Sequence, residues 1–227
     1  MPDITVFYGL YGSGKTEISI NYALSLRRQG KDVIIVDLDA VTPYFRVRDV
    51  RDQLVRAGLI VVAPKESVRH ADLPVLPEGV RSALQNPESA IVVDVGGDPT
   101  GSRVLGGLRD ALSPDAKGLF VVNSSRPFTR TVEDAVKAVE GIASASGLPV
   151  SGLVANTHMT SETTAEHVVQ GVEFARELGR RTGLPVVFAA APSNLEPQKD
   201  EIGRRIDRLP VLWLKRYLKK PWEEDEQ

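Results

Sequence analysis

One stretch, Gly9-Leu10-Tyr11-Gly12-Ser13-Gly14-Lys15-Thr16, constrains the fold of this chain more than any other. It matches the pattern G-x-x-x-x-G-K-[ST] and lies between an apolar run, Ile4–Tyr8, and a helix-forming run, Glu17–Gln29. A strand, a tight loop and a helix in this order are the context in which the pattern binds phosphate groups. The three glycines let backbone N–H groups converge on an anion, with the positive end of a helix behind them. We therefore expect a nucleotide phosphate site here.

Two side chains of this loop have the chemistry that a nucleoside triphosphate needs. Lys15 is a point charge long enough to reach the β- and γ-phosphates. The Thr16 hydroxyl is a suitable ligand for the Mg²⁺ that accompanies the triphosphate. The nucleotide-binding residues expected from this loop are Gly9, Tyr11, Gly12, Ser13, Gly14, Lys15, Thr16 and Glu17.

Composition excludes several other kinds of site. The chain has 227 residues and no cysteine, which rules out disulfides, Fe–S clusters, thiolate zinc sites and a cysteine nucleophile. A formal net charge of -2 gives no overall field favouring nucleic acid or an acidic membrane. His70, His158 and His167 lie too far apart in sequence for their spacing to suggest a metal centre. The sequence has no basic leader and no apolar run of about 18 residues, so we expect a cytoplasmic protein.

Apolar runs typical of buried strands alternate with helix-like segments along the chain. This spacing predicts right-handed βαβ units in one doubly wound α/β domain over residues 1–208. We expect a mostly parallel sheet of about seven strands with helices on both faces, and a ligand over the carboxyl ends of the strands. The expected strands are Ile4–Tyr8, Val33–Asp37, Leu59–Ala63, Ile91–Val95, Leu119–Asn123, Gly152–Asn156 and Val186–Ala189.

Acidic residues follow two of these strands. Asp37 and Asp39 end the second strand and point the same way, a geometry suited to Mg²⁺ and to orienting a nucleophile. Asp94 ends the fourth, and Gly97 and Asp98 follow it, as expected of a Mg²⁺-binding aspartate with a switch loop whose glycine faces the γ-phosphate. Capping of the following helices is the alternative role for such carboxylates. We favour Asp39 as a catalytic and metal-binding residue and Asp94 as a metal ligand, and we leave Asp37 and Asp98 open.

Asparagines end two later strands, at Asn123 and Asn156. An amide donates and accepts hydrogen bonds at once, as recognition of a purine edge requires, although loop amides also satisfy backbone groups. Asn156 is the stronger candidate, and the segment Ala191-Pro192-Ser193-Asn194 is expected to form a wall for the base. We therefore add Gly97, Asn156 and Pro192 to the nucleotide-binding residues.

Together, the phosphate loop, Asp37-x-Asp39, Asp94-x-x-Gly97 and Asn156 resemble the MinD/ParA/CobQ/ArsA branch of P-loop NTPases over roughly residues 3–207. The segments Val36-Asp37-Leu38-Asp39, Pro43-Tyr44-Phe45-Arg46 and Ala71-Asp72-Leu73-Pro74 look more closely like a bacterial group of CobQ/CobB/MinD/ParA nucleotide-binding proteins. The resemblance implies ATP and Mg²⁺ as cofactors. It also implies that Asp39 positions the attacking water, that Thr16 and Asp94 hold Mg²⁺, and that Asn156 reads adenine.

One loop position departs from that family. MinD and ParA proteins carry an additional lysine early in the loop, which reaches the partner's phosphates in a nucleotide-sandwich dimer, and here the aligned residue is Leu10. Either dimer-activated hydrolysis is absent, or an arginine replaces the lysine, with Arg46, Arg48 and Arg126 available near strand ends. A homodimer therefore stays open.

The C-terminal segment, residues 209–227, is expected to form an amphipathic helix and an acidic tail. Val211, Leu214 and Leu218 share one helical face, and basic residues gather toward the other side. MinD-type ATPases bind membranes through such a tail. However, packing on the domain is the commoner use of an apolar stripe, and residues 223–226 are acidic. We expect packing rather than membrane binding.

These features predict a Mg²⁺-dependent ATPase that uses its nucleotide state as a switch toward a partner protein, with Lys15 and Asp39 as catalytic residues. One alternative is an ATP-dependent small-molecule kinase or ligase related to dethiobiotin synthetase and the CobQ group. In that case Arg46, Arg48 and Arg103 would bind an acidic acceptor. A third hypothesis is a nucleotide-gated assembly factor with negligible turnover. A GTPase is less favoured, because no Asn-Lys-x-Asp motif follows a late strand.

Overall fold

The computed structural model of the chain describes residues 2–39, 45–64 and 76–218. Within these ranges, one sheet of eight strands has the order β3-β2-β4-β1-β5-β6-β7-β8, and each neighbouring pair is parallel. The doubly wound α/β fold predicted from the sequence is confirmed. The strands are β1 (Asp3–Tyr8), β2 (Val33–Leu38), β3 (Ile60–Val62), β4 (Ala90–Val95), β5 (Lys117–Val122), β6 (Gly152–Ala155), β7 (Val186–Pro192) and β8 (Val211–Leu214).

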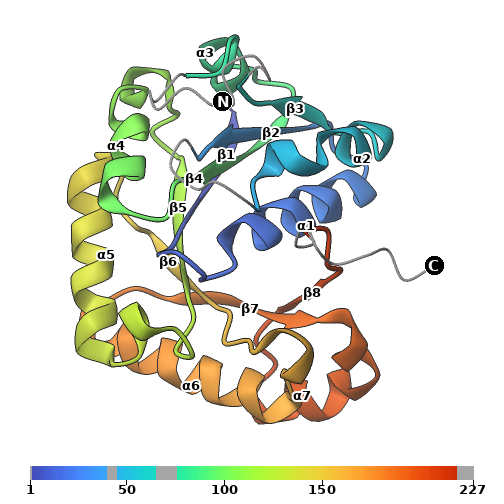
Figure 1. The fold of residues 1–227 in the computed structure, drawn as a ribbon, viewed down its shortest axis with the longest axis vertical. Coiled ribbons are helices and arrows are strands. Elements are labelled where there is room, and N and C mark those ends of the chain that lie inside the picture. Colours follow the sequence, from blue (N-terminus) through green and yellow to red (C-terminus); the bar gives the residue numbers. More distant parts are fainter. Residues whose placement is uncertain (1, 40–44, 65–75, 219–227) are drawn as a thin grey trace.

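Helices cover both faces of this sheet (Figure 1). The helices α1 and α2 pack on one face, and α3 to α7 pack on the other. The α-helices are α1 (Lys15–Arg28), α2 (Arg51–Arg56), α3 (Val80–Leu84), α4 (Pro99–Gly106), α5 (Val132–Ser146), α6 (Ala165–Thr182) and α7 (Lys199–Arg205). Short 3-10 helices are η1 (Val47–Val50), η3 (Arg109–Ala111), η4 (Pro127–Thr129), η5 (Thr160–Glu162) and η6 (Ser193–Gln198).

The strands send alternate side chains into two separate hydrophobic cores. In β1, Ile4, Val6 and Tyr8 face the core beneath α4, α5 and α6, whereas Phe7 faces the core beneath α1. Both faces of the central strands are therefore buried, and β4 has no exposed residue. This two-sided burial is the reason that the sequence of the central strands is continuously apolar rather than alternating.

The position of β1 fixes where a ligand can lie. β1 is flanked by β4 on one side and β5 on the other, so the chain leaves it toward β2 in one direction and returns to β5 in the other. Ligands of open α/β sheets bind at such a switch point, outside the carboxyl ends of the strands. The loop after β1 is the glycine-rich stretch, which places it at the centre of that edge.

The C-terminal segment differs from its prediction. The expected amphipathic helix is wrong for residues 211–214, because Val211–Leu214 form β8 and pair with Ala189–Pro192 of β7. Leu212 and Leu214 pack toward one core and Val211 and Trp213 toward the other, which is the alternation of a strand. The segment therefore belongs to the sheet of the same domain. The expected acidic tail lies outside the described residues.

Candidate functional site

The loop between β1 and α1 has a backbone shape that requires glycine. Gly12 and Gly14 have positive φ angles of 78° and 85°, in the left-handed region that other residues rarely adopt. A Cβ atom on Gly9 would lie 2.5 Å from Ser13 Oγ and 2.8 Å from the carbonyl oxygen of Val121. Gly14 is also the residue from which α1 starts, so the loop opens directly onto the positive end of a helix of 14 residues.

The lysine of this loop is buried and paired with an aspartate. Lys15 Nζ lies 3.1 Å from Asp39 Oδ2 and 3.5 Å from Thr16 Oγ1. Burial by itself lowers the pKa of Lys15, but the nearby carboxylates of Asp94 and Asp39 raise it above its ordinary value. Lys15 therefore keeps its positive charge at the point where the sequence predicts phosphate groups.

Asp94 carries a carboxylate that is only partly satisfied. It is fully buried at the end of β4, and Ser19 Oγ donates to its Oδ1 at 3.3 Å. Its Oδ2 has no hydrogen-bond partner among the described residues. Burial raises the pKa of Asp94 to about 7, opposed by the positive charge of Lys15. A cation, or a water bound to one, would satisfy the orphaned oxygen.

The donor atoms near this oxygen suit Mg²⁺. Thr16 and Asp94 are both buried close to Lys15, and hydroxyl and carboxylate oxygens are the ligands that Mg²⁺ prefers. Within residues 2–39, 45–64 and 76–218 there is no cluster of three or more His, Cys, Asp or Glu side chains that could hold a metal by itself. A Mg²⁺ ion here would therefore depend on phosphate oxygens and water for most of its ligands, as is usual when it accompanies a nucleotide.

Asp37 and Arg48 hold the backbone of Asp39. Arg48 donates from Nε to Asp37 Oδ2 at 2.8 Å and from Nη2 to Asp37 Oδ1 at 3.0 Å. The same guanidinium donates to the carbonyl oxygen of Asp39 at 2.6 Å, and Asp37 Oδ1 accepts the Asp39 N–H. Asp37, which the sequence left open, is thus a positioning residue in a buried ion pair.

The other open carboxylate, Asp98, caps a helix. It precedes α4, and its Oδ1 accepts the N–H of Gly101. Gly97 packs against the phosphate loop, since a Cβ there would lie 3.1 Å from the backbone nitrogen of Tyr11. The segment after β4 therefore touches the loop through a glycine, while its aspartate stabilises the helix that follows.

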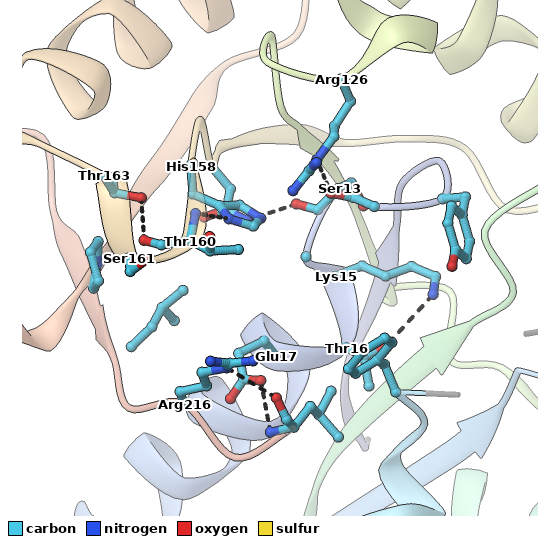
Figure 2. Close-up of a pocket in the computed structure, with 18 of the residues that line it drawn as sticks. Ser13, Lys15, Thr16, Glu17, Arg126, His158, Thr160, Ser161, Thr163 and Arg216 are labelled. Carbon is cyan, nitrogen blue, oxygen red and sulfur yellow. Dashed lines mark hydrogen bonds between the residues drawn. The ribbon is translucent and has the colours of Figure 1, made fainter. Parts of the chain in front are cut away.

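A cavity of about 640 Å³ opens above the loop (Figure 2). Of the predicted nucleotide-binding residues, Gly9 and Gly97 lie outside its lining, as do Asp39 and Asp94, which lie deeper beside Lys15 and Thr16. The far walls come from the ends of β6, β7 and β8, with Arg126 on one side and Arg216 on another. The predicted residues that line the cavity are Tyr11, Gly12, Ser13, Gly14, Lys15, Thr16, Glu17, Asn156 and Pro192.

Asn156 lines the cavity but already serves the loop. Its Nδ2 donates to the carbonyl oxygen of Ser13 at 2.7 Å, and the residue is almost fully buried. Asn123 is buried too, accepts the N–H of Ser125 and does not line the cavity. Of the two asparagines at strand ends, the one that we favoured from the sequence, Asn156, is the one that lines the cavity. In this structure its amide nitrogen fixes the shape of the phosphate loop.

Sequence reasoning missed the wall made by residues 214–218. Glu17 accepts the N–H groups of Tyr217 and Leu218 at 2.6 and 3.1 Å. Asn21 donates to the carbonyl oxygen of Lys215 and accepts its N–H, both at 2.9 Å. These contacts place Leu214, Arg216 and Leu218 in the cavity lining. The signal in the sequence was a pair of polar residues, Glu17 and Asn21, at helical spacing on a face that is otherwise buried.

His158 also lines the cavity without having been predicted to do so. Burial, together with the positive charge of Arg126, lowers the pKa of His158 to about 4, so it is neutral at pH 7. Of the other two histidines, His70 lies outside the described residues and His167 packs at the start of α6, where its ring accepts the N–H of Thr164. No described histidine is part of a metal cluster.

This arrangement, a glycine loop after the central strand β1 with a buried lysine and with aspartates from the ends of β2 and β4, defines a P-loop NTPase. The chain belongs to the CobQ/CobB/MinD/ParA nucleotide-binding domain family, whose sequence profile matches residues 4–187. The family expected from the sequence is confirmed.

Curated relatives are signal recognition particle proteins. The protein from Mycobacterium leprae (strain TN) is 28% identical over 204 residues, which cover 86% of this chain and 36% of that protein. The protein from Synechococcus elongatus is 29% identical over 129 residues, which cover 54% of this chain and 25% of the relative. The chain thus spans about a third or less of the length of these relatives.

Two solved structures illustrate the fold that this chain shares with other proteins. The signal recognition particle 54 kDa protein from Aeropyrum pernix K1, in complex with GDP, has a TM-score of 0.56 at 20% identity. The match covers 83% of this chain and 41% of that protein's chain. The cell division protein FtsY from Thermotoga maritima has a TM-score of 0.54 at 16% identity, and the match covers 84% of this chain and 62% of that protein's chain. At these identities the likeness shows a shared fold. In the described part of the chain, no helix has the length and apolar composition to cross a membrane.

Proposed function

We propose that this protein binds and hydrolyses ATP with Mg²⁺ and uses its nucleotide state as a switch toward a partner. The observation that carries the proposal is the combination beneath the loop of a charged Lys15, its partner Asp39, and the orphaned Asp94 Oδ2. Deep burial of three ionisable groups is costly unless a ligand uses them. A triphosphate with its cation would satisfy all three at once.

The residues of the chain divide the work of hydrolysis. Lys15 and the loop amides stabilise charge on the phosphates. Phosphate oxygens compete with Asp39 for Lys15, which releases the carboxylate to orient the attacking water. Asp37 and Arg48 hold Asp39 in register while this happens. Thr16 and Asp94 would hold Mg²⁺, which neutralises phosphate charge when it is bound.

The choice of base needs a direct test. Asn156 and the wall at Pro192 support adenine through the family resemblance, and the sequence has no Asn-Lys-x-Asp motif for guanine. The GDP complex of a protein with a similar fold makes GTP the competitor that must be measured beside ATP. We expect ATP to bind more tightly than GTP.

The kinase or ligase alternative receives little support from the arginines expected to serve it. Arg46 pairs with Asp49 at 3.3 Å, and Arg48 is bound to Asp37 and to the carbonyl oxygen of Asp39. Arg103 is exposed on α4 and does not line the cavity. A partner surface has more support, because two aromatic side chains are exposed at the nucleotide edge of the sheet: Tyr11, in the phosphate loop, at 61%, and Phe128, in η4, at 64%.

Calorimetry and light scattering with ATP, GTP and their non-hydrolysable analogues plus Mg²⁺ test the proposal. We expect saturable ATP binding that Lys15→Ala weakens by at least about 100-fold, since the main phosphate cation is lost. A doubled mass with nucleotide would make the partner a second copy, and an unchanged mass would direct the search to another protein. The proposal is wrong if neither nucleotide binds, or if Lys15→Ala binds like the parent.

A further inference from the structure

One arginine at the cavity has a different environment from the others near the strand ends. Arg126 follows β5, is half-buried, and donates from Nε to the carbonyl oxygen of Gly12 at 3.1 Å. Its Cδ and Nε lie 3.4 Å from the place where a Cβ on Gly12 would stand. Figure 2 shows the side chain lying over the phosphate loop beside Ser13. The guanidinium is therefore in van der Waals contact with the loop that cradles phosphates.

The segment that carries Arg126 is anchored rather than loose. Arg126 donates its own N–H to the carbonyl oxygen of Asn123, and that oxygen also accepts from Thr129 Oγ1 at 2.6 Å. The Ser124 hydroxyl pairs with Thr157 Oγ1 at 2.9 Å, which ties the segment to the end of β6. A guanidinium held from a fixed backbone loses little entropy when it binds an anion.

The charge of Arg126 has no carboxylate to neutralise it. Arg46 and Arg48 are paired with Asp49 and Asp37, whereas no acidic group lies within 4.0 Å of Arg126 in the part of the chain that the structure describes. Neither of its Nη atoms donates a hydrogen bond to a described residue. A guanidinium with free donors at the rim of an anion pocket is available for a phosphate.

We infer that Arg126 is a catalytic residue that contacts the bound triphosphate from within the same chain, in place of the loop lysine whose position Leu10 occupies. The inference rests on the proposed function. In hydrolysis, the water oxygen forms a bond to the γ-phosphorus, and the bond from that phosphorus to the bridging oxygen breaks. The electron pair of the broken bond goes to the diphosphate, and a water proton passes through Asp39 to the released phosphate. Arg126 donates to the oxygens on which negative charge increases.

Single-turnover release of γ-phosphate, with protein in excess over ATP, measures this step even if turnover is slow. We expect Arg126→Ala to slow release by at least about 100-fold. Arg126→Lys should recover only part of the rate, because a lysine ammonium lacks the planar fork through which a guanidinium donates to two oxygens at once. The affinity for a non-hydrolysable ATP analogue should change by less than about tenfold, because the loop amides and Lys15 remain. Arg130→Ala, on an exposed arginine four residues away, is the matched control and should react like the parent.

Mixing two defective variants separates action within one chain from action between chains. Lys15→Ala is expected to bind nucleotide only weakly but retains Arg126, so adding it to Arg126→Ala should leave hydrolysis slow. Recovery of the rate in the mixture would overturn the assignment within the chain, because Arg126 would then act from a second copy. A rate for Arg126→Ala within threefold of the parent would overturn the catalytic role itself. Failure of the parent to bind nucleotide would instead refute the proposed function.

Discussion

The two sides of the cavity are built on opposite principles. On the side of β2 and β4, buried aspartates pair with Lys15 and with the partly buried Arg48, and an oxygen of Asp94 has no hydrogen-bond partner among the described residues. On the side of β8, Glu17 and Asn21 bind neutral peptide groups of residues 215–218, and the N–H groups that they reach are satisfied. The first side therefore has a polar group available for a ligand, whereas the polar groups named on the second side are already hydrogen-bonded and form a wall.

The largest effect is expected at the charged side. Asp39→Asn removes the carboxylate that orients water, so the hydrolysis rate should fall by about 1000-fold, while ATP binding is retained because Lys15 no longer has a charged competitor. Single-turnover kinetics and calorimetry measure the two quantities. Asp98→Asn keeps a helix cap and should leave both unchanged. Loss of binding together with rate would mean that Asp39 only supports the loop.

The next effect concerns the pair that positions Asp39. Arg48→Ala leaves Asp37 buried without its cation, so the free energy of unfolding should fall by about 3 kcal/mol or more. Urea unfolding followed by circular dichroism gives this value. Arg51→Ala, on an exposed arginine at the start of α2, should change it by less than about 0.5 kcal/mol. Equal values for the two variants would refute the positioning role.

A smaller effect is expected at the wall. Asn21→Ala removes both hydrogen bonds to the Lys215 peptide and strands its N–H, which should cost about 2 kcal/mol. Fluorescence of Trp213 on β8 should report local loosening before global unfolding. Asn194→Ala, which changes an exposed asparagine, is the control. If Asn21→Ala matches that control, residues 215–218 are held by packing alone.

The smallest effect is the pH dependence set by His158. Its folded-state pKa of about 4 lies below the ordinary histidine pKa of 6.5, so the unfolded chain takes up the proton first. The corresponding stability is present above pH 6.5 and is lost as the pH falls toward 4. In His158→Gln, the free energy of unfolding should fall by about 1 kcal/mol less than in the parent over this pH range. In His167→Gln, it should fall by the same amount as in the parent. Parallel pH profiles for the parent and His158→Gln would contradict the assignment.

Much of the fold could be predicted because the relevant signals are local. The run Ile4–Tyr8, the glycine loop and the helix after it each follow from residues within a few positions of one another. Continuous apolar strands separated by helical stretches leave few topologies besides a doubly wound sheet. Asp39 and Asp94 could be proposed as site residues because the carboxyl ends of parallel strands meet at one edge, and Asp37 and Asp94 are register partners in the structure.

The role of a charged side chain could not be predicted where it depends on a partner that is distant in the sequence. Asp37 and Asp39 look equivalent in sequence, and only the approach of Arg48 makes one a structural anchor and leaves the other beside Lys15. Arg46, Arg48 and Arg126 were equal candidates to replace a lysine. Pairing with Asp49 and Asp37 removes two of them and leaves the third over the loop.

The sequence by itself determined the nucleotide-binding class and the position of the phosphate loop, because a backbone that turns at Gly12 and Gly14 needs glycine whatever surrounds it. The tertiary structure alone decided the secondary structure of Val211–Leu214. Their apolar spacing fits a helix or a strand, and the open edge of β7, with Asn21 holding Lys215 from 194 positions away, selects the strand. A short segment takes the conformation that satisfies its backbone, and here the partners are the edge of β7 for residues 211–214 and Asn21, near the start of the chain, for Lys215.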